Sequence, residues 1–185
     1  MDISIHINES DFIEACIRQE EWAQKKLYED HYQMMFPTCL RYARDEEEAL
    51  DILHDGFIKI FKNIGKYKIG TSLTAWIKRV MVNTAIDHYR RNVRKRTESI
   101  ESARELVNLD ADVISKMAAE EIILALQELS PAYRSVFNLY VIEGYSHKEV
   151  AKALHITEST SRSNLVKARN KLKIILKRKS ISVNE

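Results

Sequence analysis

Apolar residues in the first half of the chain recur at helical spacing. Between residues 9 and 44 they fall three or four positions apart, which predicts one or two helices. Pro37 should be a bend or a boundary there, because proline lacks the N–H that a helix interior needs. The same spacing predicts a helix over 46–63 with Phe57 on its buried face. An acidic turn at 45–48 precedes that helix and complements its dipole.

Helical spacing continues after a loop with two glycines. Ser72 is a suitable N-cap for a third helix, from Leu73 to about Arg94. Positions 94–112 show no sustained periodicity and mix charges with Ser, Thr and Asn, which is typical of a linker. Periodicity returns from about Val113 to Leu129, and we expect a further helix there.

The C-terminal part reads as three more helices. Ser130-Pro131 is a strong helix start, with Ser as N-cap and Pro at the first helical position, and the helix should end at Gly144. Ser146 should cap a short helix and Thr157 a second one. The second helix runs from Glu158 to about position 177, or ~30 Å at ~1.5 Å per residue.

This capped pair, at 143–179, has the layout of a helix-turn-helix whose second helix enters a DNA groove. Its polar side chains suit hydrogen bonds to base edges, and its basic ones suit phosphates. The alternative is a basic, solvated amphipathic helix. The candidate contacts to an upstream DNA element are Thr160, Arg162, Ser163, Asn164, Lys167 and Arg169.

Composition and pattern together predict an all-α protein. Four glycines and two prolines in 185 residues leave few sharp turns, and alternating β-type runs are scarce. We expect two small helical domains, at 8–93 and 113–180, joined by a linker at 94–112. The second domain carries the helix-turn-helix.

The net charge of +2 hides alternating blocks. Residues 1–60 hold fourteen acids and six bases, whereas 61–96 hold one acid and ten bases. Acids lead by eight to two over 97–130, and bases lead by eleven to four over 131–185. This distribution indicates two separate surfaces for anionic partners.

The second basic surface lies on the predicted helix that follows Ser72. Arg79, Asn83, Asp87 and Arg90 are spaced at i, i+4, i+8 and i+11, so they share one face. Basic residues, an amide and nearby aromatics such as Trp76 suit unstacked bases. Plain core packing is the favoured explanation for Trp76, and an exposed helical amide is the alternative for Asn83.

The sequence contains no pattern typical of an enzyme or a metal site. Cys16 and Cys39 lie in apolar helical contexts without CxxC spacing, and the six histidines form no HExxH pattern. We therefore expect no catalytic residue, cofactor or bound metal. The start has no secretory signal pattern, and no apolar run reaches the ~20 residues of a membrane span. We expect a cytoplasmic protein without membrane insertion.

Three segments, in this order along the chain, each resemble one part of the same protein family. ALDILHDGFIKIFKNI resembles the polymerase-binding helix of a sigma-70 family RNA polymerase sigma factor of the extracytoplasmic-function (ECF) type. TSLTAWIKRVMVNTAIDHYRR resembles the promoter-melting helix of that family. LQELSPAYRSVFNLYVIEGYSHKEVAKALHITESTSRSNLVKARNKLK resembles its second domain. The match spans about residues 27–173.

The resemblance implies specific partners and roles. The protein would bind a coiled coil on the largest subunit of core RNA polymerase, and an anti-sigma protein is implied as an inhibitor. The upstream contacts given above would recognise the minus-thirty-five element of promoter DNA. The implied polymerase-binding residues are Asp51, His54, Asp55, Phe57 and Ile58. The implied minus-ten contacts are Ile69, Thr71, Ser72, Arg79, Asn83, Asp87 and Arg90.

Two departures from the family pattern qualify this match. His54-Asp55 stands where a Gln-Glu pair is common, which keeps the polarity of the docking face. Asn164 stands where a basic residue is common, so the resemblance does not carry over the details of base choice. The linker of about 20 residues reaches at most ~65–70 Å, close to two DNA turns.

Two rival functions remain open from the sequence. One is a helix-turn-helix regulator with an N-terminal sensing or dimerisation domain, which would have no need of the basic helix at 74–96. The other is a DNA-acting enzyme with an acidic metal cluster. The only dense acidic cluster, at 45–48, has the character of a helix cap.

Overall fold

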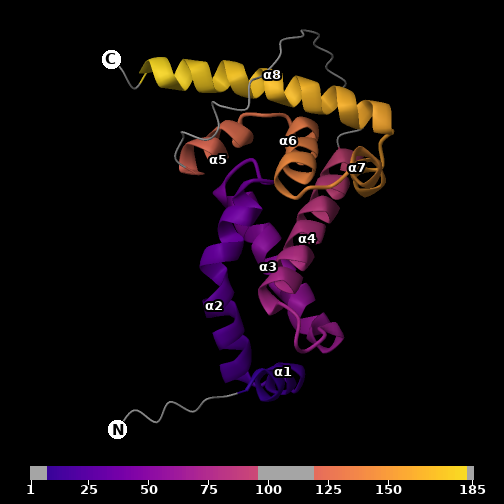
Figure 1. Cartoon of the computed structure of the whole chain (residues 1–185). Helices are drawn as coiled ribbons and strands as arrows, with labels where there is room; N and C mark the ends of the chain where they lie inside the picture. The colour runs from indigo at the N-terminus through magenta and orange to yellow at the C-terminus, as the bar shows by residue number, and fades with distance from the viewer. Residues whose placement is uncertain (1–7, 96–118, 183–185) are drawn as a thin grey trace.

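The computed structural model describes residues 8–95 and 119–182, and all regular structure within these ranges is helical (Figure 1). The predicted all-α class is confirmed. The helices of the first range are α1 (Glu9–Ile17), α2 (Glu21–Leu40), α3 (Glu46–Asn63), η1 (Ile64–Lys66) and α4 (Leu73–Lys95). Those of the second range are α5 (Ala119–Gln127), α6 (Pro131–Phe137), η3 (Asn138–Ile142), α7 (His147–Leu154) and α8 (Glu158–Ser182).

The first domain is built on the three long helices α2, α3 and α4, which pack against one another, while α1 crosses the end of the bundle beside η1 (Figure 1). Its core includes Leu27, Leu53 and Ile77, all fully buried. Gly56 lets α3 approach α4 closely, because a Cβ at that position would lie 2.2 Å from Sδ of Met81. The bundle thus holds the faces of α3 and α4 in a fixed relation.

Local capping explains where these helices begin. The Asp45 carboxylate accepts a hydrogen bond from the Glu48 amide at 2.9 Å, and the Ser72 hydroxyl accepts one from the Ala75 amide at 3.2 Å. Both caps were predicted. Of the two roles expected for Pro37, a bend or a boundary, the boundary is wrong: Pro37 lies in the last turn of α2, and the helix continues to Leu40. Only one intrahelical hydrogen bond is lost at a proline there, so the turn persists.

The second domain is organised around α8, which lies across α5, α6 and α7 (Figure 1). Ser130 caps α6 and Pro131 opens it, as predicted. The helix then widens into the π-helical turn η3, and Gly144 with φ +74° ends it at the expected place. The inner side of α8 is apolar and includes Leu165, Ala168 and Leu172.

The predicted domain boundaries overlap the described ranges only in part. Helix α4 reaches Lys95, just past the predicted start of the linker at 94. The rest of that linker, at 96–112, and the predicted helix start at 113–118 lie outside the described residues. Helix α8 extends to Ser182, beyond the expected end near 177.

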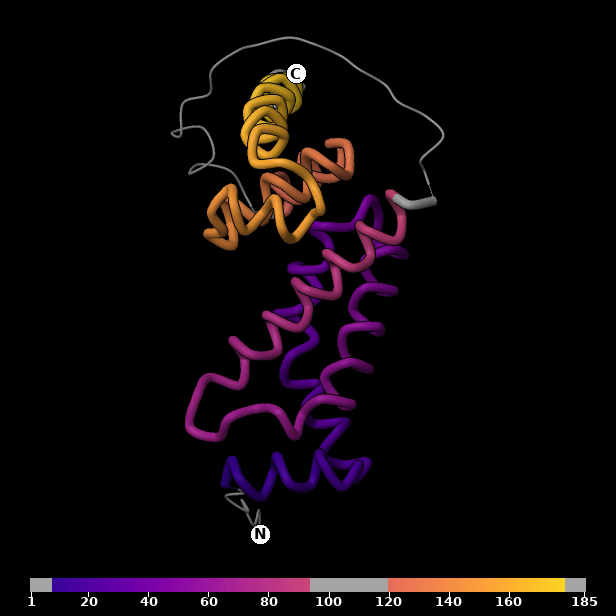
Figure 2. Tube along the Cα trace, turned by 90° about the vertical axis from the view of Figure 1, so that its right-hand side faces the viewer, coloured from indigo at the N-terminus to yellow at the C-terminus, as the bar shows by residue number. Residues whose placement is uncertain are grey.

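The two domains are in contact. Helix α7 packs against α4, and α5 lies beside α2, so the second domain rests on one end of the three-helix bundle (Figures 1 and 2). Helix α8 lies on the far side of the second domain from that contact (Figure 1).

Candidate nucleic-acid interface

The turn between α7 and α8 is fixed by local hydrogen bonds. Ser146 and Glu149 form a capping box at the start of α7, in which the Glu149 carboxylate accepts from the Ser146 amide at 2.8 Å. His155 ends α7 in the left-handed region at φ 56°, and the Ile156 amide donates to the Ala151 carbonyl at 3.0 Å. The Thr157 hydroxyl then accepts from the Thr160 amide at 3.1 Å and caps α8. The predicted helix-turn-helix caps are present.

A buried polar contact joins α7 to α8 beneath this turn. The Ser161 hydroxyl is fully buried and lies 2.9 Å from Nδ1 of His147. The His147 ring also stacks on Tyr140, with ring centroids 4.2 Å apart. Burial, and then the positive charge of Arg162, lower the pKa of His147. These contacts fix how α8 leaves the turn, and the sequence pattern did not single them out.

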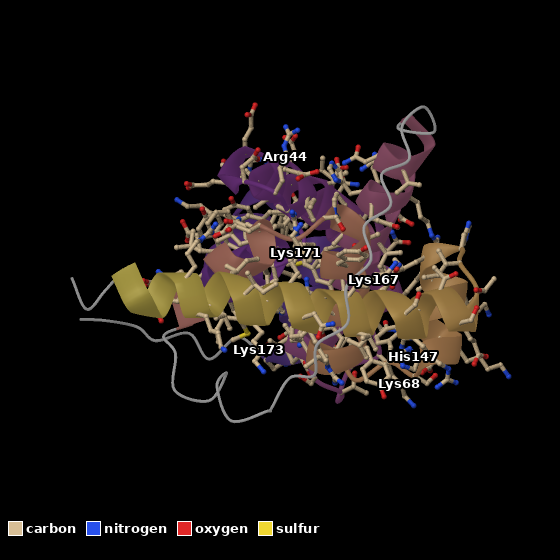
Figure 3. The ribbon with its side chains drawn as sticks, turned by 90° about the horizontal axis from the view of Figure 1, so that it is seen from above. Arg44, Lys68, His147, Lys167, Lys171 and Lys173 are labelled. Carbon is tan, nitrogen blue, oxygen red and sulfur yellow. The ribbon has the colours of Figure 1, made fainter. Side chains whose placement is uncertain are left out.

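The predicted upstream contacts are on the outer surface of α8, but they are spread around it. Arg162, Ser163 and Arg169 are exposed, whereas Thr160, Asn164 and Lys167 are half-buried. At 3.6 residues per turn, Arg162 and Arg169 share one flank and Thr160 and Asn164 the other. Figure 3 shows Lys167, Lys171 and Lys173 spaced along α8, with His147 near its N-terminal end. A single DNA groove would therefore meet Ser163 and Lys167, which lie between the flanks, together with the residues of only one flank.

Arg162 also has a partner on its own helix. Its guanidinium lies 3.4 Å from the Glu158 carboxylate, one turn earlier, and both side chains are largely exposed. Such an exposed pair contributes little to stability, so it does not hold the Arg162 side chain in place.

The loop before α4 is held by Glu9, a residue that the sequence pattern did not single out. The Tyr67 hydroxyl lies 2.7 Å from the carboxylate of Glu9 on α1 and also contacts the Thr71 carbonyl. The same carboxylate accepts a hydrogen bond from the Gly70 amide at 3.2 Å. This clamp leaves Ile69 47% exposed at the loop tip. Thr71 and Ser72 are exposed beside it, so the predicted loop contacts are accessible.

The predicted face of α4 divides into an exposed end and an occupied end. Arg79 and Asn83 are exposed. Asp87 forms ion pairs with Lys59 at 2.8 Å and with Arg90 at 3.6 Å. Arg90 Nε also donates to the Ala153 carbonyl of α7 at 2.7 Å. The half of this face near the second domain is thus engaged within the protein.

Most of the predicted polymerase-binding residues of α3 form a stripe on its surface, which we call the α3 stripe. Phe57 is the exception. Asp51 and His54 are exposed, and Ile58 is 50% exposed on the same side. Asp55 pairs with Arg91 of α4 at 2.9 Å. Phe57 is 2% exposed and packs on Tyr28 with ring centroids 4.6 Å apart, so it belongs to the core and not to this face.

A pocket of about 330 Å³ lies between the α3 stripe and α4. The residues that line it are Asp51, His54, Asp55, His88, Arg91 and Asn92. Its lining combines acidic, basic and amide groups, and the Asp55–Arg91 ion pair lies on its wall.

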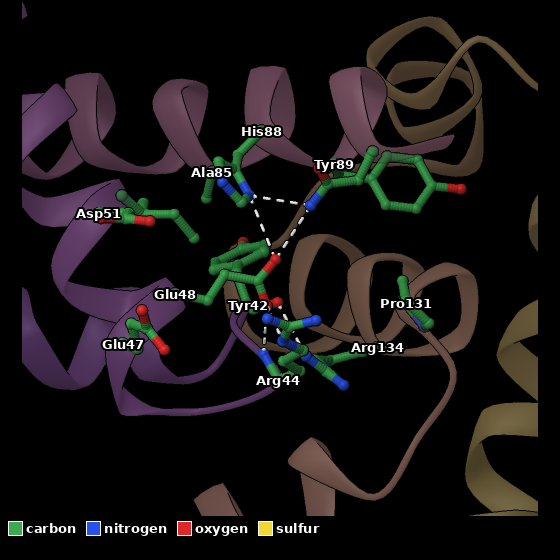
Figure 4. A pocket seen from close by; sticks show the side chains of 12 residues that line it. Tyr42, Arg44, Glu47, Glu48, Asp51, Ala85, His88, Tyr89, Pro131 and Arg134 are labelled. Carbon is green, nitrogen blue, oxygen red and sulfur yellow. Dashed lines mark hydrogen bonds and ion pairs between the residues drawn. The ribbon is translucent and has the colours of Figure 1, made fainter. Parts of the chain in front are cut away.

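A larger pocket, of about 520 Å³, lies where the start of α3 meets α4 and α6 (Figure 4). Glu48 sits at its centre: it accepts a hydrogen bond from Asn92 at 3.0 Å and lies 3.4 Å from Nδ1 of His88. Arg134 reaches in from α6, and its burial lowers its pKa (Figure 4). The acidic turn at 45–48 is a helix cap, as predicted, and the structure adds that its Glu48 takes part in a polar network with His88 and Asn92.

Metal clusters and membrane spans are absent from the described ranges. Residues 8–95 and 119–182 contain no group of three or more His, Cys, Asp or Glu side chains placed to hold a metal ion. None of the helices described there has the length and hydropathy needed to cross a bilayer. Cys16 and Cys39 are free, buried thiols, and burial raises their pKa values to about 11 and about 12.

Comparisons with known proteins agree with this architecture. The family model for sigma-70 region 2 matches residues 27–95, and that for sigma-70 region 4 matches residues 119–172. The ECF RNA polymerase sigma factor SigM of Mycobacterium tuberculosis is 23% identical over 96% of this chain and 89% of its own length. The RNA polymerase sigma-H factor of Pseudomonas aeruginosa is 24% identical over 85% of this chain and 88% of its own.

Among solved structures, a similar chain is the sigma factor RpoE of Bartonella quintana, crystallised in complex with the anti-sigma factor NepR. The match covers 82% of this chain and 98% of that one, with 22% identity and a TM-score of 0.47. The two family models match the two folded domains separately and in order. The chain therefore belongs to the sigma-70 family and is a sigma factor of the ECF type.

Proposed function

We propose that the chain binds core RNA polymerase and directs it to promoters through two DNA contacts on separate domains. The outer surface of α8 recognises the upstream element as duplex. The loop at 67–72 and the face of α4 bind the minus-ten element as unpaired bases. The observation that carries this proposal is the presence of both surfaces, on two folded domains, in one chain.

The α4 surface supports strand opening without enzymatic activity. The clamped loop presents Ile69, and the exposed side chains of Arg79 and Asn83 continue its surface along α4. Apolar and amide groups of this kind bind unstacked bases better than paired ones. A surface with that preference shifts the equilibrium toward open DNA by binding alone. The function places the protein beside DNA and polymerase in the cytoplasm.

The α3 stripe is the proposed docking site for the polymerase coiled coil. Asp51 and His54 supply polar contacts, and Ile58 supplies exposed apolar area, whereas Phe57, predicted beside it, is buried. A helix face with apolar and charged groups at i, i+3 and i+7 suits another helix as partner. An anti-sigma protein is a further proposed partner of this chain, and the similar Bartonella quintana sigma factor was crystallised in complex with one.

The docking proposal is tested by charge reversal on the stripe. Asp51→Arg should weaken binding to core polymerase about tenfold, because it alters a polar contact at the interface while leaving the core intact. The measurement is fluorescence anisotropy of the labelled protein titrated with core polymerase. Glu29→Arg is the matched control, since Glu29 is an exposed carboxylate on α2 away from the stripe. Equal affinities for both variants and the wild type would rule out this docking face.

The rival function, a duplex-binding regulator that works without polymerase, predicts a different result. Such a protein would bind promoter duplex tightly alone and show no affinity for core polymerase in the same titration. The folded α3–α4 domain with its clamped loop favours the sigma function, because a regulator has no use for a surface suited to unpaired bases.

A further inference from the structure

The loop before α4 is folded as a tight turn over residues 68–71. The Thr71 amide donates to the Lys68 carbonyl at 3.2 Å, and the Thr71 hydroxyl donates to the same carbonyl at 2.7 Å. Gly70 is the third residue of this turn and has φ +83°. A glycine with positive φ at that position is typical of a type II turn. Ile69 is the second residue, and its side chain is 47% exposed at the corner.

The orientation of one peptide group separates this turn from its common alternative. Turns of types I and II can share the same end-to-end hydrogen bond, but their central peptide differs in orientation by roughly 150° or more. Here the central peptide joins Ile69 to Gly70, so its N–H group is that of Gly70. Because glycine is compatible with both turn types, an outside partner for this N–H group decides which one forms.

Glu9 of α1 is that partner. Its Oε2 accepts a hydrogen bond from the Gly70 amide at 3.2 Å, and its Oε1 accepts one from the Tyr67 hydroxyl at 2.7 Å. Tyr67 is 6% exposed, and its ring lies beside Trp76 with centroids 5.9 Å apart. One carboxylate therefore fixes both the central peptide of the turn and the buried residue that precedes it.

Helix α1 is anchored well enough to act as a fixed point. Ile13 and Cys16 are buried against the bundle, and the Asn8 side chain caps the helix by accepting from the Asp11 amide at 2.8 Å. Glu9 follows directly after this cap. Helix α1 also lies outside residues 27–95, which the family model for region 2 matches. The clamp thus joins the loop to a helix that the family model does not cover.

The charge of Glu9 should by itself oppose DNA binding. Its side chain is exposed and touches a loop that the proposed function places against an anionic strand. Like charges repel, so a carboxylate here weakens the contact unless it has a compensating role. Loss of the charge and loss of the clamp therefore have opposite effects on affinity, and an experiment can separate them.

We propose that Glu9 is a positioning residue for the minus-ten contact. By binding the Gly70 amide and the Tyr67 hydroxyl, it keeps the turn in the type II form and so sets how Ile69 meets unpaired bases. A loop already held in its binding conformation loses less entropy when DNA binds. The part that concerns DNA rests on the proposed function and deepens it, whereas the clamp itself does not.

Two substitutions of Glu9 separate hydrogen bonding from charge. Glu9→Gln removes the charge but keeps an oxygen for the Gly70 amide, and its NH2 group donates to the Tyr67 hydroxyl, which then donates to the Thr71 carbonyl. Glu9→Ala removes the charge and both hydrogen bonds. Glu14→Ala is the matched control, because Glu14 is an exposed carboxylate on the same helix that pairs with Arg18 at 3.5 Å.

The DNA readout uses the holoenzyme assembled from the chain and core polymerase. The probe is a fluorescein-labelled single strand, the non-template strand of a fragment that the wild-type chain transcribes. Glu9→Ala should weaken its binding about tenfold, whereas Glu9→Gln should bind at least as tightly as the wild type and Glu14→Ala should stay within about twofold of it. All variants should keep the wild-type affinity for core polymerase.

Three results of this titration would overturn the role of Glu9. Equal or tighter binding by Glu9→Ala would mean that the carboxylate acts on DNA only through its charge. A Glu9→Gln variant as weak as Glu9→Ala would mean that the hydrogen bonds do not carry the effect. A loss of core affinity in Glu9→Ala would place the defect in folding or docking.

Hydrogen exchange of the Gly70 amide, followed by NMR in the free chain, tests the clamp without DNA. Exchange should be about tenfold faster in Glu9→Ala and near the wild-type rate in Glu9→Gln. An unchanged rate in Glu9→Ala would overturn the clamp. If the wild-type holoenzyme binds no single strand, the proposed minus-ten contact fails and the role of Glu9 fails with it, while the exchange rate still decides the clamp.

Discussion

At the scale of single residues, the side chains that position the DNA-binding surfaces are as informative as those expected to touch DNA. His147 joins Tyr140 to Ser161 of α8, and Glu9 holds the loop before α4. Neither could be predicted, because a lone histidine or glutamate in a helical pattern has no distinguishing neighbour in the sequence. The exposure of Arg162 and Asn83 could be predicted, because the apolar spacing of a regular helix shows which positions face away from the core.

His147 makes stability depend on pH in a defined direction. Burial and Arg162 hold its pKa below the usual value of 6.5, so the unfolded chain binds a proton more readily than the folded one. The free energy of unfolding should therefore fall as the pH drops through about 6.5 and level off below the lowered pKa. His147→Gln removes this titration and keeps a hydrogen-bonding side chain near Ser161.

The comparison requires urea unfolding of wild type and His147→Gln at about pH 7.5 and about pH 5.5. The wild type should lose more stability between the two values than the variant. The remaining histidines and carboxylates contribute equally to both proteins, so the difference isolates His147. Parallel losses would show that the ring is not held in its neutral form.

At the scale of elements, the spacing of apolar residues predicts the helices, and N-cap residues predict where each helix begins. Asp45, Ser72, Ser130, Ser146 and Thr157 were all predicted as caps, and each caps the expected helix. This success has a physical reason, because a cap needs only a side chain and amides two or three residues away. Phe57 was assigned to a surface as well as to a buried face. Only the three-helix packing decides between them, and it places Phe57 in the core.

The capping box at Ser146 makes a direct prediction for the recognition unit. Ser146→Ala removes the oxygen that accepts from the Glu149 amide at 3.3 Å, and should lower the free energy of unfolding by about 1 kcal/mol. Ser146→Thr keeps the acceptor and should stay near the wild-type value. Thermal or urea unfolding measures both. Because Ser146 is exposed, lost packing cannot account for the effect, and equal stability of the two variants would disprove the cap's contribution.

At the scale of the whole molecule, the sequence predicted two domains with separate nucleic-acid surfaces but not how they meet. The contacts between the domains are made by charged or amide residues, which look like solvated surface in a sequence; these residues are Arg41, Lys78, Arg134, Asn138 and Glu143. The Arg41–Glu143 pair spans 102 positions in the chain, so no local pattern reveals it. The alternating charge blocks indicated only that the domains carry distinct surfaces.

The function proposed for the whole molecule is that this chain confers promoter-specific initiation on core polymerase. It is tested by run-off transcription from a library of genomic fragments with core polymerase alone, the chain alone and both together. Discrete transcripts should appear only with both, and should be lost with Asp51→Arg but not with Glu29→Arg. Tight duplex binding by the chain alone, with no change in polymerase initiation, would contradict this function.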